Sequence, residues 1–353
     1  MTFTAAEHAA MERALALAAT PGVPHGPNPR VGCVLLDPSG TEVAEGFHRG
    51  AGTPHAEVDA LAAAGEAARG ATAVVTLEPC DHTGRTGPCT AALLAAGVVR
   101  VVFAQADSNP VARGGAATLR EAGVDVEGGL LEAQARRLNR AWTFGHEHGR
   151  PFVTWKFATT LDGRSAAADG SSRWVSSRAA RLDTHRLRGE CDVVLVGTGT
   201  VAVDDPQLTV RDEVDELLPR QPLRVVMGER DLPGGRRVFD ASAETLRLRT
   251  RDPVAALYEL GARGHQHVFL EGGPTLAAAF LTAGLVDEVV AYVAPMLLGA
   301  GRSAVGDLGI ATITDAVHLP VVDVHVLQGH ASGEHDVEDT NVRITLARRE
   351  GKV

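Results

Sequence analysis

His55-Ala56-Glu57, followed by Glu78-Pro79-Cys80 and Pro88-Cys89, decides how the first half of the chain folds and what it can bind. His55 opens an alanine-rich helical run, Cys80 follows the apolar strand 73–77, and Cys89 starts a helix that Gly97 ends. One imidazole and two thiols can hold a zinc ion with its fourth position open to water, as in catalytic zinc sites. Glu57 is not needed as a ligand, so its carboxylate is free to move protons.

The spacing of the two cysteines differs from the usual signature of zinc deaminases that act on nucleobases. That signature is H-x-E…P-C-x-x-C, whereas eight residues separate Cys80 from Cys89 here. Taken singly, His55 could be a surface histidine, and the cysteines could be small buried hydrophobes or a disulfide. The helix starts at His55 and Cys89 favour ligands, because the positive end of a helix stabilises thiolate. The combination predicts a catalytic zinc site.

Length and charge limit the classes of protein to consider. A chain of 353 residues predicts two domains at roughly 150 residues each. The net charge of −10 argues against a general nucleic-acid binder, so an anionic substrate needs local arginines. We find no secretory signal and no apolar stretch long enough to cross a bilayer. We therefore expect a cytoplasmic protein with four reduced cysteines and no membrane partner.

Strands and helices alternate in the first half, which predicts an α/β sandwich over residues 1–149. Thr4-Ala5-Ala6-Glu7 has the spacing of a capping box and starts a helix. The run 131–149 reads as one helix, and Gly149-Arg150-Pro151 ends it, so we place the second domain at 150–353. Asn28, between two prolines, can present its amide to a base edge, or it can simply form a turn.

The second half restarts the pattern and predicts another α/β sheet. Two glycine-rich turns, Gly197-Thr198-Gly199-Thr200 and Glu271-Gly272-Gly273-Pro274-Thr275, each join a strand to a helix. Such turns let backbone N–H groups approach a phosphorylated cofactor. Neither turn is G-x-G-x-x-G, and the first could be a tight turn without a ligand. Glu271 follows a strand, at the edge where α/β sheets bind ligands.

Charged residues in this half have functional and structural readings. Lys156 interrupts an apolar strand, so it needs a partner or a task unless its amine reaches the strand end. Asp204 and Asp205 are adjacent, so we expect one to face the site and the other to support the loop; a solvated acidic turn is the alternative. Arg188 and Arg211 could bind a phosphate monoester through their planar forks.

Together these motifs resemble the bifunctional pyrimidine deaminase/reductases of riboflavin biosynthesis. The similarity spans nearly the whole chain. It rests on His55-Ala56-Glu57, the segment 79–89, Leu161-Asp162-Gly163-Arg164, the turn 197–201 with Asp204-Asp205-Pro206, and Glu271-Gly272-Gly273. The wide cysteine spacing, which departs from other zinc deaminases, is what this family shows.

The resemblance implies an α/β fold with a cytidine-deaminase-like αβα sandwich that binds Zn2+, followed by a dihydrofolate-reductase-like α/β domain that binds NADPH. The first domain would deaminate a phosphorylated pyrimidine, 2,5-diamino-6-ribosylamino-4(3H)-pyrimidinone 5′-phosphate. The second would reduce the ribosyl chain to ribityl, giving 5-amino-6-ribitylaminouracil 5′-phosphate. We also expect a homo-oligomer, a dimer or tetramer, with no nucleic-acid partner.

The resemblance also implies roles for single residues. His55, Cys80 and Cys89 would hold zinc, with Glu57 as the proton shuttle. Lys156 and Asp204 would be catalytic in the reduction. The substrate contacts would be Asn28, Ser172, Arg188, Leu208, Arg211 and Glu271. The cofactor contacts would be Ala158, Trp174, Thr200, Asp204, Gly273, Pro274 and Thr275.

Two loops depart from the family pattern. Ser108 and Gly87 stand where proline is usual, a change that should alter loop stiffness more than chemistry. The polar segment 329–339 reads as a mobile hairpin or loop. Two rival hypotheses are a deaminase whose second domain only binds a ligand, and a non-enzymatic regulator with a structural zinc.

Overall fold

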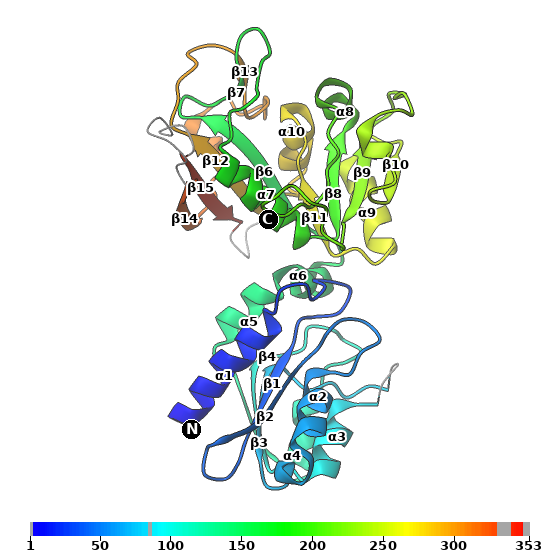
Figure 1. Ribbon diagram of the computed structural model, residues 1–353, viewed down its shortest axis with the longest axis vertical. Helices are drawn as coiled ribbons and strands as arrows, with labels where there is room; N and C mark the ends of the chain where they lie inside the picture. Colours follow the sequence, from blue (N-terminus) through cyan, green and yellow to red (C-terminus); the bar gives the residue numbers. More distant parts are fainter. Residues whose placement is uncertain (1–2, 84–86, 330–339, 349–353) are drawn as a thin grey trace. The chain divides into compact units, whose positions relative to one another are not determined.

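The computed structural model describes residues 3–83, 87–329 and 340–348, and the chain divides into two compact units, Met1–Arg150 and Pro151–Val353 (Figure 1). Each unit is described by itself. Residues 84–86 of the cysteine loop, and residues 330–339 of the hairpin or loop expected over 329–339, lie outside the described residues.

The first unit is a five-stranded sheet with helices on both faces (Figure 1). The strand order is β2-β1-β3-β4-β5; β1 is antiparallel to β2 and β3, and the remaining pairs are parallel. The strands are β1 (Gly32–Leu36), β2 (Glu42–Phe47), β3 (Thr72–Leu77), β4 (Arg100–Gln105) and β5 (Asp125–Gly128). The helices are α1 (Ala5–Ala18), α2 (Ala56–Ala64), α3 (Cys89–Ala96), α4 (Gly115–Glu121), α5 (Glu132–Leu138) and α6 (Arg140–His148), with a 3-10 turn η1 (Gly65–Ala68).

Alternate residues of the strands build two cores, one on each face of the sheet. Cys33 and Leu35 of β1 pack with α2, α3 and α4, whereas Val34 and Leu36 pack with α1 and α5. The predicted capping box of α1 is present, with Thr4 and Glu7 bonded to each other's backbone N–H. The expected αβα layering of this unit is confirmed.

The single helix expected over 131–149 is wrong. The chain breaks at Asn139, whose buried amide accepts from the Arg30 N–H at 2.8 Å and donates to the Arg30 carbonyl at 2.9 Å. This pairing with a loop far back in the sequence holds Asn139 outside regular helix geometry, so α5 ends at Leu138 and α6 begins at Arg140.

The second unit is an eight-stranded sheet in the order β10-β9-β8-β11-β6-β12-β15-β14, with a small β13-β7 pair. Its strands are β6 (Phe152–Thr160), β7 (Arg164–Ala166), β8 (Val193–Gly197), β9 (Leu223–Met227), β10 (Thr245–Leu248), β11 (His267–Leu270), β12 (Glu288–Ala294), β13 (Arg302–Ser303), β14 (Val321–Gln328) and β15 (Thr340–Ala347). Its helices are α7 (Arg178–Gly189), α8 (Thr198–Asp204), α9 (Pro253–Ala262) and α10 (Pro274–Thr282), with 3-10 turns η2 (Arg237–Phe239) and η3 (Ile313–Asp315).

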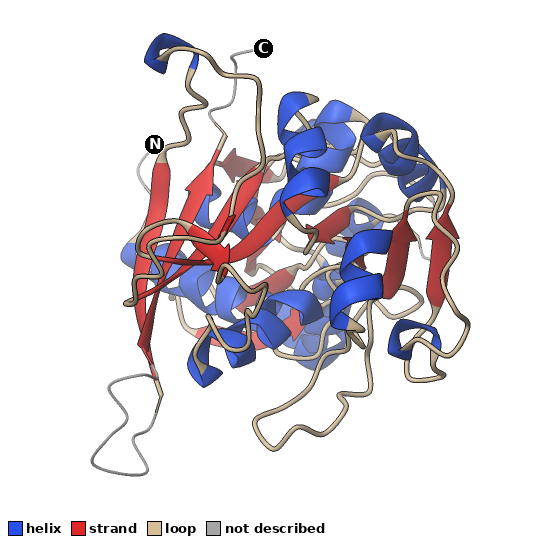
Figure 2. Ribbon diagram, turned by 90° about the horizontal axis from the view of Figure 1, so that it is seen from above, coloured by secondary structure: helices blue, strands red, loops and turns tan. Residues whose placement is uncertain are grey.

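The six neighbouring strands β10, β9, β8, β11, β6 and β12 run parallel to one another. Strands β15 and β14 extend the sheet, each antiparallel to its neighbour. Helices cover both faces of the central strands (Figure 2). Val193 and Leu195 of β8 pack with α9 and α10, whereas Val194 and Val196 pack with α7 and α8. Because the central strands are parallel, the turns that follow β8 and β11 lie at the same edge. Among the described helices, none has the length and apolar character needed to cross a membrane.

Gly46 allows β2 to lie against α2, the helix that carries His55 and Glu57 at its start. A Cβ atom at Gly46 would lie 2.4 Å from the Ala60 nitrogen and 2.6 Å from the Ala56 oxygen. We therefore expect Gly46→Ala to lower the free energy of unfolding of the first unit by about 1–3 kcal/mol through overpacking. Urea unfolding measures the loss, and hydrogen exchange over residues 42–64 locates it.

The matched control is Gly234→Ala, because a Cβ at Gly234 meets no atom within 4 Å. Equal stability of the two alanine variants would contradict the packing argument.

Candidate active sites

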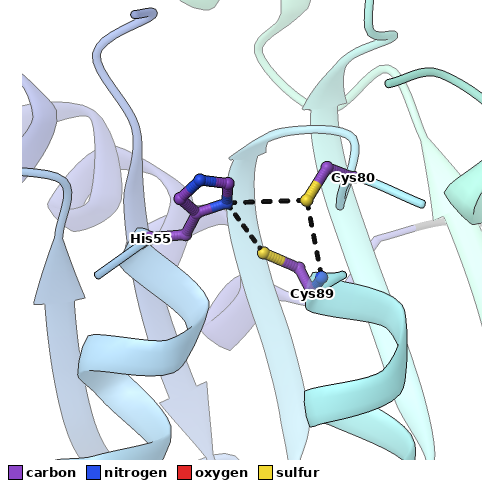
Figure 3. Close-up of side chains that lie close together, drawn as sticks. All are labelled: His55, Cys80 and Cys89. Carbon is purple, nitrogen blue, oxygen red and sulfur yellow. Dashed lines mark hydrogen bonds between the residues drawn. The ribbon is translucent and has the colours of Figure 1, made fainter. Parts of the chain in front are cut away.

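Three elements bring the donor atoms of His55, Cys80 and Cys89 together (Figure 3). His55 is the N-cap of α2, Cys80 follows β3, and Cys89 is the first residue of α3. The His55 Nδ1 atom lies 3.2 Å from Cys89 Sγ and 3.5 Å from Cys80 Sγ. All three donor atoms lie within 4.8 Å of one another, and both thiols are buried.

This donor set fits zinc. Zinc–nitrogen and zinc–sulfur bonds of about 2.0–2.3 Å in a tetrahedron place donor atoms roughly 3.5 Å apart. The two distances from His55 match that separation. Three protein donors leave one tetrahedral position for water, the arrangement of catalytic rather than structural zinc sites.

The electrostatics of the cluster favour a cation. A hydrogen bond from the Cys89 thiol, together with His55, lowers the pKa of Cys80 to about 4, and the Cys89 backbone N–H also donates to Cys80 Sγ at 3.4 Å. Burial, with a smaller contribution from the negative charge of Cys80, raises the pKa of Glu57 to about 6. Glu57 is only 4% exposed, and its carboxyl group forms a hydrogen bond with the Cys89 thiol, so it lies in the same dry pocket as the two thiols.

Hydrogen bonds of the residues on either side of Cys80 hold this segment in place. Glu78, which precedes it, accepts hydrogen bonds from the backbone N–H groups of Asp107 and Ala116 at 3.1 and 3.0 Å. Asp81, which follows it, accepts from the hydroxyls of Thr90 and Thr118, both at 2.6 Å. These contacts fix Cys80 against the loop that follows β4 and against α3 and α4.

Asn28 and His48 form a pair beside the cluster. The Asn28 amide nitrogen lies 3.0 Å from His48 Nε2, and the His48 ring packs edge-on against His55. Burial lowers the pKa of His48, so the ring favours its neutral form. Sequence reasoning missed His48; its only signal is a polar residue directly after the expected strand 43–47.

A second constellation lies at the carboxyl edge of the large sheet. Lys156 of β6 places its Nζ atom 4.0 Å from Glu271, which follows β11, and 5.6 Å from the centre of the Tyr292 ring on β12. Arg188 of α7 donates to both carboxylate oxygens of Glu271. The sequence left open whether Lys156 has a partner or extends its amine to the strand end. The structure places a partner, Glu271, beside it.

Burial and charge compete in this group. Burial lowers the pKa of Lys156, and Glu271 opposes that shift. Burial alone would raise the pKa of Glu271, but the cations Arg188 and Lys156 outweigh it and keep the carboxylate ionised. Arg188 also donates to the Thr209 carbonyl at 2.9 Å. The group is therefore a nearly dry, charge-compensated cluster beside the sheet edge.

The two glycine-rich turns lie side by side. Gly197 is the N-cap of α8, and Gly273 is the N-cap of α10 with Pro274 in the first turn. A Cβ atom at Gly273 would lie 3.9 Å from Thr200 Oγ1. Neither helix start has a side-chain cap, so first-turn N–H groups remain for an anionic group. The pair of turns fits the phosphates of a nucleotide cofactor.

The remaining expected residues differ in exposure. Asp205 supports the loop by accepting from the Arg237 N–H at 3.0 Å, whereas the Asp204 side chain is exposed. Arg211 bonds Thr209 and Gln207 nearby. Ser172 and Trp174 are exposed, with the Arg181 guanidinium 4.5 Å from the Trp174 ring; Ala158 is partly buried on β6 and Leu208 is buried.

Comparison with known proteins follows the division of the fold. Residues 4–105 match the model for the cytidine and deoxycytidylate deaminase zinc-binding region, and residues 151–329 match the RibD C-terminal domain. The chain is 52% identical to the riboflavin biosynthesis protein RibD of Mycobacterium tuberculosis, over 82% of this chain and 86% of the relative. The chain belongs to the RibD family. The RibD protein of Escherichia coli is 42% identical, over 87% and 92% of the two chains.

Solved structures of RibD proteins have the same fold. A crystal form of Acinetobacter baumannii RibD superposes with a TM-score of 0.87 at 36% identity, covering 97% of this chain and 98% of that one. A deaminase/reductase from Thermotoga maritima superposes with a TM-score of 0.84 at 31% identity, over the same shares.

Membership in the RibD family confirms the resemblance drawn from the sequence. The chain is a bifunctional riboflavin-biosynthesis enzyme, with a zinc-dependent deaminase domain of the cytidine-deaminase type and an NADPH-dependent reductase domain of the dihydrofolate-reductase type. The two rival hypotheses, a deaminase alone and a non-enzymatic regulator, do not agree with this family.

Cys89→Ala should empty the cluster of zinc, because two remaining donors bind the ion weakly. We expect metal content to fall from about one zinc per chain to near zero after dialysis. Cys33→Ala is the matched control, since Cys33 is a buried free thiol outside the donor set. Elemental analysis of both variants checks the assignment, which fails if Cys89→Ala keeps its zinc.

Proposed function

We propose that residues 1–149 hydrolyse the exocyclic amine of 2,5-diamino-6-ribosylamino-4(3H)-pyrimidinone 5′-phosphate, and that residues 150–353 then reduce the ribosyl chain. Water enters and ammonia leaves in the first reaction; NADPH is oxidised in the second, and the product is 5-amino-6-ribitylaminouracil 5′-phosphate. The T. maritima relative carries the name diaminohydroxyphosphoribosylaminopyrimidine deaminase/5-amino-6-(5-phosphoribosylamino)uracil reductase, which supports this substrate.

The observation that carries the deaminase assignment is the three-donor cluster with a buried carboxyl group beside it. His55, Cys80 and Cys89 hold the zinc ion, which when bound supplies an activated water molecule. Glu57 takes a proton from the attacking water and delivers it to the departing amine. Its raised pKa suits both halves of that task. Asn28 orients the pyrimidine.

In the reductase domain, Lys156, Asp204 and Glu271 line the site of reduction. NADPH supplies the reducing equivalents when bound. Lys156 donates a proton to the reduced sugar, because burial makes its ammonium a better acid than an exposed lysine. Glu271 keeps Lys156 in place through their ion pair.

We assign the contacts with ligands as follows. Substrate is bound by Ser172, Arg188, Leu208, Arg211 and Glu271 in the reductase domain. The cofactor is bound by Ala158, Trp174, Thr200, Asp204, Gly273, Pro274 and Thr275. The uncapped starts of α8 and α10 support this placement of the cofactor phosphates.

We also propose that the enzyme works in the cytoplasm as a homo-oligomer, without a nucleic-acid or membrane partner. Its four cysteines are free and buried, as a reducing compartment allows. Strand β14 lies at the edge of the large sheet, and Val321, Val324 and Val326, which pair with alternate residues of β15, are 60%, 57% and 54% exposed. An exposed apolar edge of this kind favours a second copy.

Glu57→Gln keeps the size of the side chain but cannot carry a proton. We expect the deamination rate to fall by about two to four orders of magnitude. Zinc content and the reduction of supplied aminouracil should be unchanged. Ammonia release, elemental analysis and NADPH oxidation measure the three quantities, and full deaminase activity in the variant would exclude Glu57 as the proton shuttle.

Lys156→Met is the reciprocal test, because methionine fills the strand position without a charge or an acidic proton. We expect NADPH oxidation with supplied aminouracil to fall at least about a hundredfold, while ammonia release stays at its normal rate. Loss of both activities from this one change would show that the two domains are not independent.

A further inference from the structure

His48 is a buried histidine with no role in the chemistry above. It follows β2 and is only 5% exposed, and its ring centre lies 5.5 Å from that of His55. Buried ring nitrogens need hydrogen-bond partners. Nδ1 lies 2.9 Å from the Pro54 carbonyl oxygen, and Nε2 lies 3.0 Å from the Asn28 amide nitrogen.

These partners fix the position of the ring proton. A carbonyl oxygen can only accept, so Nδ1 carries the proton. Thr53 Oγ1 also lies 3.4 Å from Nδ1, but the Thr53 hydroxyl donates to the Gly50 carbonyl at 2.8 Å, so it too can only accept from the ring. Nε2 therefore keeps its lone pair and accepts a hydrogen bond from the Asn28 amide.

The direction of that hydrogen bond decides how Asn28 is turned. With its nitrogen committed to His48, Asn28 keeps its Oδ1 atom without a hydrogen-bond partner among the described residues. If the amide were reversed, Oδ1 would face the lone pair of Nε2, and the two acceptors would repel. His48 thus holds Asn28 Oδ1 as a fixed acceptor.

We propose that His48 is a positioning residue of the deaminase site, which sets the Asn28 amide so that Oδ1 accepts a hydrogen bond from an N–H group on the pyrimidine edge. Its second bond, to Pro54, ties this contact to the residue before the zinc ligand His55. The inference rests on the proposed role of Asn28 and adds which substrate edge is selected. An edge that offers only acceptors would leave Oδ1 facing a lone pair and is rejected.

A double-mutant cycle in the full-length, zinc-loaded enzyme tests this proposal. His48→Phe, Asn28→Ala and the double variant are compared in steady-state deamination of the diaminopyrimidinone phosphate. We expect His48→Phe to raise KM roughly tenfold to a hundredfold, the effect of one misdirected buried hydrogen bond, with a smaller change in kcat. The double variant should match Asn28→Ala, because His48 acts through Asn28.

His48→Gln serves as the conservative variant, since glutamine keeps one donor and one acceptor. Its KM should lie between that of the unchanged enzyme and the raised KM of His48→Phe. Zinc content and reduction of supplied aminouracil report on the integrity of the two domains, and both should stay normal in every variant.

The failures can be told apart. If Asn28→Ala raises KM and His48→Phe does not, His48 has no positioning role and the proposed function of Asn28 stands. If Asn28→Ala has no effect, the proposed role of Asn28 fails, and the inference fails with it. If the effects of the two single variants on KM add in the double variant, His48 does not act through Asn28 and the proposal is overturned. It is also overturned if His48→Phe loses zinc and its KM returns to the normal value when zinc is added.

Discussion

Burial of acidic groups is the constraint on which the first domain depends. Two thiols and the carboxyl group of Glu57 share a pocket almost closed to water, although burial disfavours every one of their anions. The protein offers no lysine or arginine inside the donor set; the imidazole of His55 is the only nitrogen donor there. A divalent cation held by the thiolates would compensate their charge, and the carboxyl group of Glu57 would remain for the proton transfer proposed above. The need for zinc and the role of the spare carboxyl group thus have the same electrostatic origin.

In the reductase domain, side chains of the protein compensate the charge of a buried acidic group. Glu271 is buried, but Lys156 and Arg188 surround it with positive charge, so the carboxylate remains ionised without a metal. The negative charge in turn holds the Lys156 ammonium in an apolar strand. Because this group is compensated internally, it can face a cofactor and a neutral sugar. In the function proposed above, the cofactor phosphates would bind at the helix starts at Gly197 and Gly273, which have no side-chain cap.

Local patterns made much of both sites predictable. His55, Cys80 and Cys89 each stand at a boundary between elements, where a turn or helix start is readable from a few neighbouring residues. The role of His48 was not predictable, because it depends on two hydrogen bonds of the ring, one of them to Asn28, twenty positions away. The break at Asn139 was missed for a similar reason, since its partner Arg30 is 109 positions distant. The sequence also could not show which of Asp204 and Asp205 supports the loop. Asp205 does so by accepting a hydrogen bond from the backbone N–H of Arg237, which is again remote in sequence.

A substitution in one domain should leave the reaction of the other domain unchanged. The packing of the two hydrophobic cores gives the physical reason. The central strands of the five-stranded and eight-stranded sheets each pack against helices of their own unit. The clusters around β1 and β3 draw on residues no later than Trp142, and those around β6 and β8 on residues from Val153 onward. Cavity and overpacking effects depend on side chains in contact, so they stay within one cluster. A polar substitution at either site therefore changes one reaction and leaves the other as a measure of correct folding.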